Sequence, residues 1–303
     1  MVVAAAAVAA AVGVAVGVSH KDRVGLAWRT ELAAGIMLHL DRIDMLEVLA
    51  DSLHAVPAPE IEALRTLGQQ VPISLHGVAM GLASSHATPT ARIEVMARWV
   101  DRLSPESWSE HLAFVRAGGV EIGHMAAPPR TGATVAGAIA NIERATQLIG
   151  RAPMMENIAT LVAPPASTLL EGEWTSAIVN ATQSPLLLDL HNLYVNALNF
   201  GVDPFDLLAT MPLERVASVH LSGGEWISAP SGARRLLDDH RHDPPAAIYA
   251  LLQVLAARAS QPLSVVIERD GDYPAIEVLL AQMERARAAV AAGRAQRAWR
   301  QAA

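Results

Sequence analysis

The feature that most constrains this chain is an alternation of short β-rich runs with longer segments of helical period. The β-rich runs number eight, and each is followed by enough chain for a helix and its loops. They are Val24–Trp28, Met45–Leu49, Pro72–Val78, Trp108–Val115, Pro153–Ile158, Pro185–Asn192, Val216–Leu221 and Leu263–Arg269. The segments between them place apolar residues on one helical face, as Ile93, Met96, Ala97, Val100 and Leu103 do. Eight βα units predict a closed (β/α)8 barrel of the TIM type, in the α/β class.

No linker-like composition divides the alternating region, so we predict one catalytic barrel domain over residues 24–290. An Ala/Val-rich extension (1–23) precedes it, and a tail (291–303) follows a helix that we expect to fray into solvent from Ala286 onward. The run Met1–Ser19 lacks the positively charged start of a signal peptide, which favours a cytoplasmic protein without a membrane anchor. An open doubly wound sheet is the alternative fold, but no G-x-G-x-x-G motif follows any predicted strand.

The composition excludes several classes of function. A net charge of −7 without a basic run argues against a nucleic acid as the main partner. The absence of cysteine excludes disulfides, thiolate catalysis, iron–sulfur clusters and cysteine-bound zinc. The single lysine, Lys21, precedes the first predicted strand, so a Schiff-base or pyridoxal mechanism does not fit. Any metal must therefore be held by nitrogen and oxygen ligands.

Polar residues with ligand chemistry stand at or just after the predicted strand ends. In LLLDLHN, for example, an apolar run gives way to Asp189, His191 and Asn192, and a carboxylate at such a place needs a cation or a donor to remain ionised. The full set is His76, Glu110, His111, Glu156, Asn157, Asp189, His191, Asn192, His220, Asp238, His240 and Glu268. Because the carboxyl ends of barrel strands converge on one face, these residues are expected to meet there.

Taken singly, each histidine or carboxylate of this set is more often a hydrogen-bonded core residue or a helix cap than a metal ligand. Taken together, the carboxylates would repel one another unless cations neutralise them, and a single ion cannot use so many ligands. We therefore predict a cluster of metal ions. Mixed imidazole and carboxylate ligands suit iron, manganese or zinc. Arg29, just after the first strand, is placed to hold a substrate carboxylate, or else forms a structural ion pair.

At this point the chain resembles a known family. The successive runs GLAWR, LEVLAD, SLHGV, SEHLAF, MMEN, LLLDLHNLYVNALNFG, VHLSGG, DDH and IERD are similar to those of the DUF692 proteins, also called multinuclear non-haem iron-dependent oxidative enzymes. The methanobactin-maturation enzyme belongs to this family. The resemblance covers roughly Val24 to Val290.

The resemblance implies a TIM-type barrel with two or three iron ions that uses O2 to modify a residue, often cysteine, in a ribosomally made precursor peptide. A separate partner protein commonly presents the peptide. Carried over by position, the implied iron ligands are His76, His111, Glu156, Asp189, His220, Asp238, His240 and Glu268.

The remaining polar positions take subsidiary roles in this reading. Asp238 is either a ligand or a base, Asn157 and Asn192 are further catalytic candidates, and Arg29 and His191 are candidate substrate contacts. The chain departs from the family where it has His191, since many members carry Asn there, and at Asp51–Ser52, where Glu–Asn is frequent.

Two other functions stay open from the sequence. The first is a divalent-metal sugar isomerase or phosphodiesterase, although such isomerases usually use a catalytic lysine that this chain lacks. The second is a non-catalytic scaffold that keeps a structural metal. Reactivity of the bound metal with O2 would separate the scaffold from the oxidative enzyme, because catalysis needs open coordination positions and a scaffold does not.

Overall fold

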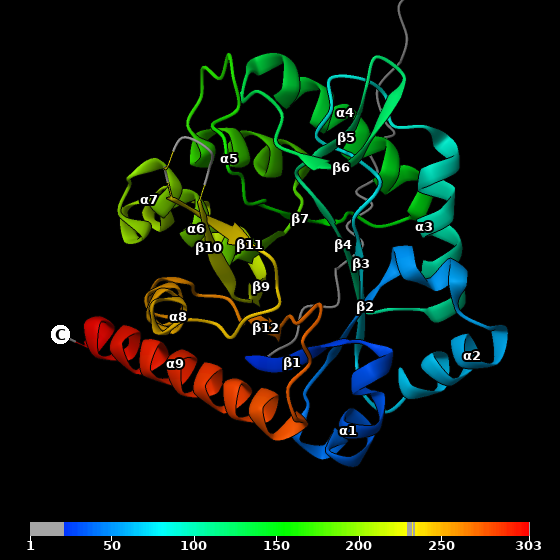
Figure 1. The fold of residues 1–303 in the computed structure, drawn as a ribbon, viewed down its shortest axis with the longest axis vertical. Coiled ribbons are helices and arrows are strands. Elements are labelled where there is room, and N and C mark those ends of the chain that lie inside the picture. Colours follow the sequence, from blue (N-terminus) through cyan, green and yellow to red (C-terminus); the bar gives the residue numbers. More distant parts are fainter. Residues whose placement is uncertain (1–20, 229–231, 233, 303) are drawn as a thin grey trace, which may run out of the picture.

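In the computed structural model, which describes residues 21–228, 232 and 234–302, eight parallel strands close into a barrel (Figure 1). The order around the barrel is β1-β12-β9-β8-β7-β4-β3-β2. The strands are β1 (Arg23–Trp28), β2 (Leu46–Leu49), β3 (Ile73–Gly77), β4 (Ser107–His111), β7 (Met154–Glu156), β8 (Leu186–Asp189), β9 (Val216–Leu221) and β12 (Ser264–Ile267). The predicted (β/α)8 barrel is confirmed.

The helices lie around the outside of the strands, as Figure 1 shows. They are α1 (Ala33–Leu38), α2 (Ala58–Leu67), α3 (Thr90–Leu103), α4 (Gly132–Ile149), α5 (Glu171–Thr182), α6 (Leu190–Phe200), α7 (Pro204–Thr210), α8 (Ala246–Arg258) and α9 (Ile276–Ala302). Short 3-10 turns cover Thr30–Leu32, Leu40–Arg42, Ala50–Ala55 and Leu213–Arg215. Strands such as β8 and β12 are buried along their whole length because helices cover one face and the barrel interior the other.

The amphipathic pattern read from the sequence matches the packing of α3. Of the predicted face, Ile93, Met96, Val100 and Leu103 are buried and Ala97 is half-buried, while Glu94, Arg98, Asp101 and Arg102 are exposed. Helix α4 shows why an element begins and ends where it does. Thr131 caps its first turn by accepting the Thr134 N–H, and Gly150 ends it in the left-handed region at φ 85°.

Two antiparallel hairpins interrupt the βα alternation. One pairs β5 (Phe114–Ala117) with β6 (Val120–Ala126), and the other pairs β10 (Gly224–Ser228) with β11 (Arg234–Asp238). The predicted strand Trp108–Val115 is therefore wrong in its second half, because the barrel strand ends at His111 and the chain then enters the first hairpin. A continuous β-rich pattern does not reveal that the chain changes from one sheet to another.

The predicted strand Pro185–Asn192 is also too long. Strand β8 ends at Asp189, whose carboxylate accepts the Asn192 N–H at 2.7 Å and so caps helix α6 from Leu190. His191 and Asn192 consequently lie in the first turn of a helix rather than at the end of a strand.

The C-terminal segment does not fray as expected. Helix α9 runs without a break from Ile276 to Ala302 and packs along α8 (Figure 1). The Arg294 guanidinium donates to Asp22 at 2.7 Å and to the Gln261 carbonyl at 2.7 Å, which ties the helix to the start of β1. The expectations for Met1–Ser19 lie outside the described residues. Within the described part of the chain, no helix is long and apolar enough to cross a membrane.

Candidate metal centre

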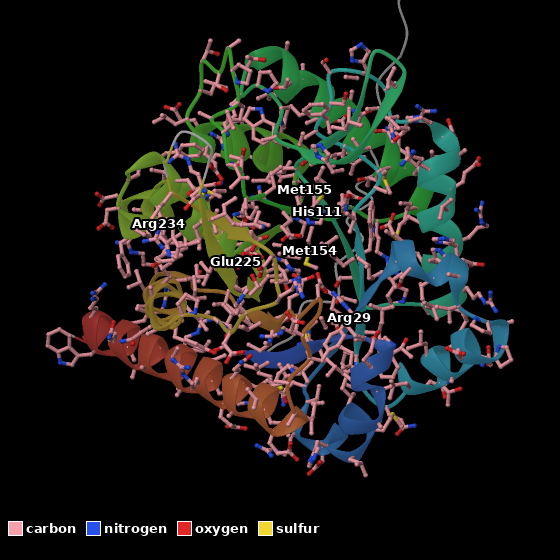
Figure 2. All side chains as sticks on the ribbon, viewed as in Figure 1. Arg29, His111, Met154, Met155, Glu225 and Arg234 are labelled. Carbon is pink, nitrogen blue, oxygen red and sulfur yellow. The ribbon has the colours of Figure 1, made fainter. Side chains whose placement is uncertain are left out.

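Seven ligand-type side chains from seven different barrel strands or their ends converge inside the barrel. They are Glu47, His76, His111, Glu156, Asp189, His220 and Glu268, and each is at most 6% exposed. The register of the sheet explains the convergence, since His111 pairs with Glu156 and Asp189 with His220 on neighbouring strands. Figure 2 labels His111, whose side chain lies near the middle of the ring of strands.

Glu156 and His220 stand at the centre of this arrangement. Glu156 Oε2 lies 3.2 Å from His111 Nε2 and 3.4 Å from His76 Nε2. Its other oxygen lies 3.4 Å from His220 Nδ1. His220 Nδ1 lies 3.0 Å from Glu268 Oε2, and its Nε2 lies 2.8 Å from Glu47 Oε1. Each of these two side chains therefore faces several partners at once.

The ligand-type atoms form four overlapping groups of three. In each group the three atoms lie no more than 4.8 Å apart. The groups are His76/His111/Glu156, Glu47/His220/Glu268, Glu156/Asp189/His220 and Asp189/His240/Glu268. Glu156, Asp189, His220 and Glu268 each belong to two groups. Shared carboxylates of this kind are able to bridge neighbouring ions, so the arrangement fits more than one metal ion.

The hydrogen bonding within the described chain supports the same conclusion. Several buried atoms of the centre lie near an oppositely charged group but form no hydrogen bond of good geometry; among them are Glu47 Oε1, Glu156 Oε2, Asp189 Oδ2 and both ring nitrogens of His220. A buried polar atom without a partner costs about 1–3 kcal/mol, and all of these atoms belong to the one small region around His220. Because the donor set is imidazole nitrogen and carboxylate oxygen, a cluster of divalent or trivalent ions fits these residues.

The electrostatics show how strongly these groups depend on one another. Burial by itself lowers the pKa of His111, but the carboxylates of Glu156 and Glu110 outweigh burial and raise the pKa to about 9. In the same way, the carboxylates around His220 raise its pKa well above the usual range despite burial. Burial, followed by the charges of Asp238 and Glu156, raises the pKa of Asp189 well above its usual range. In the metal-free site the raised pKa values favour the protonated forms of His111, His220 and Asp189. Bound metal would displace these protons.

Asp238 and His240 reach the centre from the β10–β11 hairpin and not from a barrel strand. Asp238 Oδ1 lies 2.5 Å from His191 Nδ1, and its Oδ2 lies 2.9 Å from His240 Nε2. His240 Nδ1 then lies 3.3 Å from Glu268 Oε2. The backbone of His240 adopts φ 53°, a strained conformation for a residue with a side chain. Asp238 thus bridges two imidazoles, an arrangement that orients a ligating histidine in many metal sites.

The two predicted asparagines hold the end of β8 in place. Asn157 Oδ1 accepts the Asp189 N–H at 2.9 Å, and its amide nitrogen donates to the Asp189 carbonyl at 3.0 Å. Asn192 donates to the Asn157 carbonyl at 3.0 Å, while its own buried Oδ1 has no partner within the described chain. Asn157 therefore contacts Asp189 through the backbone, and Asn192 keeps an acceptor free.

The two predicted substrate contacts lie elsewhere in the site. Arg29 Nε donates to Asp270 Oδ1 at 2.8 Å, and Arg29 Nη2 lies 3.4 Å from Glu268 Oε1. Burial lowers the pKa of Arg29, but Asp270 and Glu268 outweigh it and raise the pKa above its usual range. His191 is 1% exposed and faces Asp238. In this structure Arg29 contacts Glu268 and Asp270, and His191 contacts Asp238, so contact with a substrate stays a prediction.

A cavity of about 200 Å³ opens onto the cluster. His111, Asp238, His240 and Asn192 form its polar end. Its apolar walls are Met125, Ile158, Leu161, Val195 and Leu237, which come from β6, β11, α6 and the segment after β7. The cavity therefore joins the cluster to a space large enough for one side chain.

Sequence reasoning missed Glu47, which lies 2.8 Å from His220. The signal was present in the run LEVL of β2, where one glutamate interrupts an apolar strand whose other residues are buried or half-buried. A charged residue inside such a strand must face a partner in the barrel. Asp270, which contacts both Arg29 and His240, was also missed because it follows the predicted strand Leu263–Arg269.

Comparison with known proteins shows the family of this chain. The family model described as "RiPP precursor modification enzyme MbnB/TglH/ChrH" matches residues 23–291. The chain belongs to this family. Its similarity extends to the "UPF0276 protein" of Caulobacter vibrioides (strain NA1000 / CB15N), 30% identical over 83% of this chain and 88% of the relative. The "UPF0276 protein" of Paraburkholderia phytofirmans is 33% identical over 87% of this chain and 86% of the relative. The resemblance drawn from the short motifs is thereby confirmed.

Solved structures similar to this member of the MbnB/TglH/ChrH family are barrel enzymes. A xylose isomerase domain protein from Alicyclobacillus acidocaldarius matches with a TM-score of 0.59 and 14% identity over 89% of this chain and 99% of that chain. Endonuclease IV from Thermus thermophilus matches with a TM-score of 0.54 and 16% identity over 86% of this chain and 99% of that chain. At these identities the likeness shows the fold alone.

Proposed function

We propose that this protein is a multinuclear non-haem iron enzyme that uses O2 to modify oxidatively one residue, often cysteine in the family, of a ribosomally made precursor peptide. Two or three iron ions, as Fe(II) and Fe(III), would be the cofactor and O2 the co-substrate. The observation that carries the proposal is the set of four overlapping ligand groups that share Glu156, Asp189, His220 and Glu268. A single-metal hydrolase or isomerase has no use for so many shared ligands.

The ligands proposed for the ions are Glu47, His76, His111, Glu156, Asp189, His220, His240 and Glu268. Iron bound by this mixed imidazole and carboxylate set supplies the redox chemistry with O2. We assign Asp238 to orient His240 through its 2.9 Å contact with Nε2, in place of direct ligation.

The chain's own residues position the substrate beside the cluster. The apolar walls of the 200 Å³ cavity exclude water and take the body of one side chain. Asn192 Oδ1, which is buried and without a partner in the described chain, is the acceptor that we assign to a peptide N–H. Asp238 also lines the cavity, so it is our candidate for the group that accepts a proton from the substrate.

We further propose that a separate protein presents the precursor peptide and that the reaction takes place in the cytoplasm, where such peptides are made. We propose neither a nucleic acid nor a membrane as a partner of this protein. The net charge of −7 argues against a nucleic acid.

The test combines metal analysis with turnover. We expect protein purified without oxygen to contain more than one iron per chain by elemental analysis. With a candidate precursor peptide encoded beside the gene, and with any partner protein, we expect O2 consumption and a mass change at one residue of the peptide. Asp189→Asn should abolish this change without unfolding the barrel, because Asp189 belongs to two ligand groups.

Other outcomes would favour the alternatives. Stoichiometric zinc without iron after growth in iron-rich medium, together with conversion of a sugar or a phosphodiester, would support an isomerase or phosphodiesterase. A tightly bound metal that never reacts with O2 would support a scaffold.

A further inference from the structure

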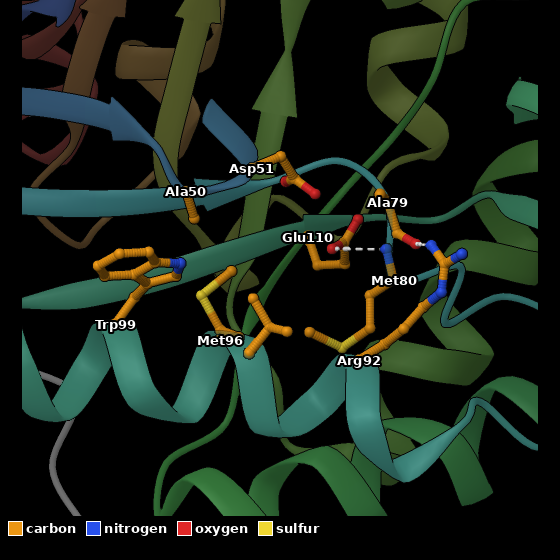
Figure 3. A pocket seen from close by; sticks show the side chains of 9 residues that line it. Ala50, Asp51, Ala79, Met80, Arg92, Met96, Trp99 and Glu110 are labelled. Carbon is orange, nitrogen blue, oxygen red and sulfur yellow. Dashed lines mark hydrogen bonds between the residues drawn. The ribbon is translucent and has the colours of Figure 1, made fainter. Parts of the chain in front are cut away.

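A second cavity, of about 240 Å³, lies outside the barrel between the carboxyl ends of β2, β3 and β4 and helix α3 (Figure 3). It is lined by Ala50, Asp51, Ala79, Met80, Arg92, Val95, Met96, Trp99 and Glu110. Successive residues of a strand point to opposite faces, so His111 of β4 faces the metal centre while Glu110 faces this cavity. We call it the α3 cavity.

Glu110 is the unusual member of the lining. Its side chain is 1% exposed, yet no arginine of the described chain forms an ion pair with it. Its oxygens accept the backbone N–H groups of His111 at 3.0 Å and Met80 at 3.3 Å. The nearest imidazole nitrogen, His111 Nδ1, lies 3.8 Å away and bonds to the Gly77 carbonyl. Within the described chain Glu110 therefore has no cation to itself, because its ion-pair partner His111 also contacts Glu156 at 3.2 Å.

The surroundings leave room for Glu110 at the edge of the cavity. At Gly77, an added Cβ atom would lie 2.6 Å from Glu110 Oε2 and 2.8 Å from the Met96 methyl carbon. A side chain at this position would therefore displace the ends of both the carboxylate and the methionine from where they lie. Gly77 on β3 thus leaves space for the Glu110 carboxylate at the edge of the α3 cavity.

The rest of the lining makes the cavity electronegative with apolar walls. Asp51 adds a second carboxylate, which accepts the Val78 N–H at 2.7 Å. The one arginine of the lining is already engaged, because Arg92 donates to the Ala79 carbonyl at 2.6 Å and pairs with Glu121 at 2.7 Å. Met80, Met96 and Trp99 supply polarizable and aromatic surface.

We propose that the α3 cavity binds a primary ammonium group on an aliphatic stem, supplied either by a lysine side chain of a peptide or by a free amine. The ammonium would neutralise Glu110 and Asp51, and the stem would pack against Met96 and Trp99. A guanidinium fits less well, because it needs two free carboxylate oxygens in one plane and both oxygens of Glu110 already accept backbone N–H groups. The site does not depend on the proposed oxidative function.

Occupancy of the α3 cavity has a direct structural link to the metal centre. Glu110, which would contact the bound ammonium, also accepts the N–H of His111 through Oε1, and the His111 ring lies 3.2 Å from Glu156. The same carboxylate therefore joins the outer cavity to an inner ligand.

Methyl NMR of the full-length protein tests the proposal, with 13C-methyl methionine and with zinc in the metal centre to avoid paramagnetic broadening. The probes are N-acetyl-lysine N-methylamide, its norleucine counterpart, which lacks the ammonium, and n-butylamine. We expect the lysine probe to shift the signals of Met80 and Met96, while Met283, which is buried on helix α9, stays unchanged. Tighter binding of the lysine probe than of butylamine would identify a peptide as the source, and the reverse order a free amine.

Two variants and a control complete the test. Glu110→Gln should weaken binding of the lysine probe at least about tenfold through loss of the charge, and Val95→Phe should block the cavity from its exposed side. Glu94→Gln, an exposed carboxylate on the same helix outside the lining, should leave binding unchanged. Equal shifts with the lysine and norleucine probes, no shift with any probe, or unaltered binding in both cavity variants would overturn the proposal.

Discussion

The ligand-type side chains on the barrel strands and the side chains at the end of the β10–β11 hairpin reach the same centre by different structural means. Glu156 and His220 lie on β7 and β9, where hydrogen bonds to both neighbouring strands fix them, and they are at most 1% exposed. Asp238 ends a two-stranded sheet and His240 follows it, and their side chains are 15% exposed. The first set is fixed by the closed sheet, while the second depends on a few side-chain contacts.

The contacts that hold the hairpin are few and specific. Asn199 of α6 bonds to both backbone groups of Leu236, at 2.8 and 3.0 Å. His191 holds Asp238, and the His240 N–H donates to the Gly223 carbonyl at 3.1 Å. One half of the centre is therefore positioned by the closed sheet, whereas the other half is positioned by contacts with helix α6 and with Gly223.

The largest effect is expected from Glu156→Ala, which removes the carboxylate that contacts His76, His111 and His220. Removal of one partner from a buried charged pair costs about 3–5 kcal/mol. We expect loss of most of the bound metal, measured by elemental analysis, and a lower free energy of unfolding, measured with denaturant. Glu121→Gln, which changes an exposed carboxylate, is the control. Full metal occupancy in Glu156→Ala would remove this residue from the centre.

The pH dependence of the metal-free protein should separate the two halves of the centre. The folded-state pKa of His111 is raised from 6.5 to about 9. Its contribution to the free energy of unfolding is therefore fully present below pH 6.5 and is lost as the pH rises through 9. A rise of this size corresponds to about 3 kcal/mol. The folded-state pKa of Asp238 is lowered from 3.8 to about 2, mainly by His240 and His191 against burial, so its contribution is present above pH 3.8 and is lost as the pH falls through 2.

Thermal unfolding of chelated protein between about pH 2 and pH 10 measures both effects. We expect the loss at alkaline pH to disappear in His111→Gln and the loss at acid pH to shrink in Asp238→Asn. An unfolding temperature of the metal-free parent that does not change between pH 6.5 and 9 would contradict the raised pKa of His111.

A smaller effect is expected from His191→Ala, which removes the partner that holds Asp238 at 2.5 Å. Loss of such a supporting contact typically lowers metal affinity about 10–100-fold. Competition with a chelator should show weaker binding of one ion, with the others retained. His191→Asn, which can still donate to Asp238, is the matched variant and should recover most of the affinity. Equal loss of every ion would mean that the hairpin and the barrel strands act as one unit.

The smallest effect is expected from Arg29→Gln. The guanidinium lies 3.4 Å from Glu268, and its main partner Asp270 has a side chain that is 39% exposed, so water compensates for part of the loss. We expect destabilisation of about 1 kcal/mol or less and nearly unchanged metal content. A strong loss of metal in Arg29→Gln would show that Arg29 sets the position of Glu268.

The sequence by itself determined the barrel and indicated most of the ligand-type side chains that converge inside it. Strand-length apolar runs that alternate with amphipathic segments leave few folds open, and a histidine or carboxylate at the end of a parallel strand has one face of the barrel to reach. His76, His111, Glu156, Asp189, His220 and Glu268 follow from this local pattern, and the structure brings them together.

Only the tertiary structure decided which contacts these residues make. Glu47 becomes a neighbour of His220 because β2 and β9, which are not adjacent in the barrel, face the same interior, a relation that periodicity cannot express. Asp238 meets His191 because a hairpin folds back over helix α6, and β-rich patterns do not reveal whether a run joins the barrel or a separate hairpin. Strand pattern is local in the chain, whereas the distance between two side chains depends on how the whole sheet closes.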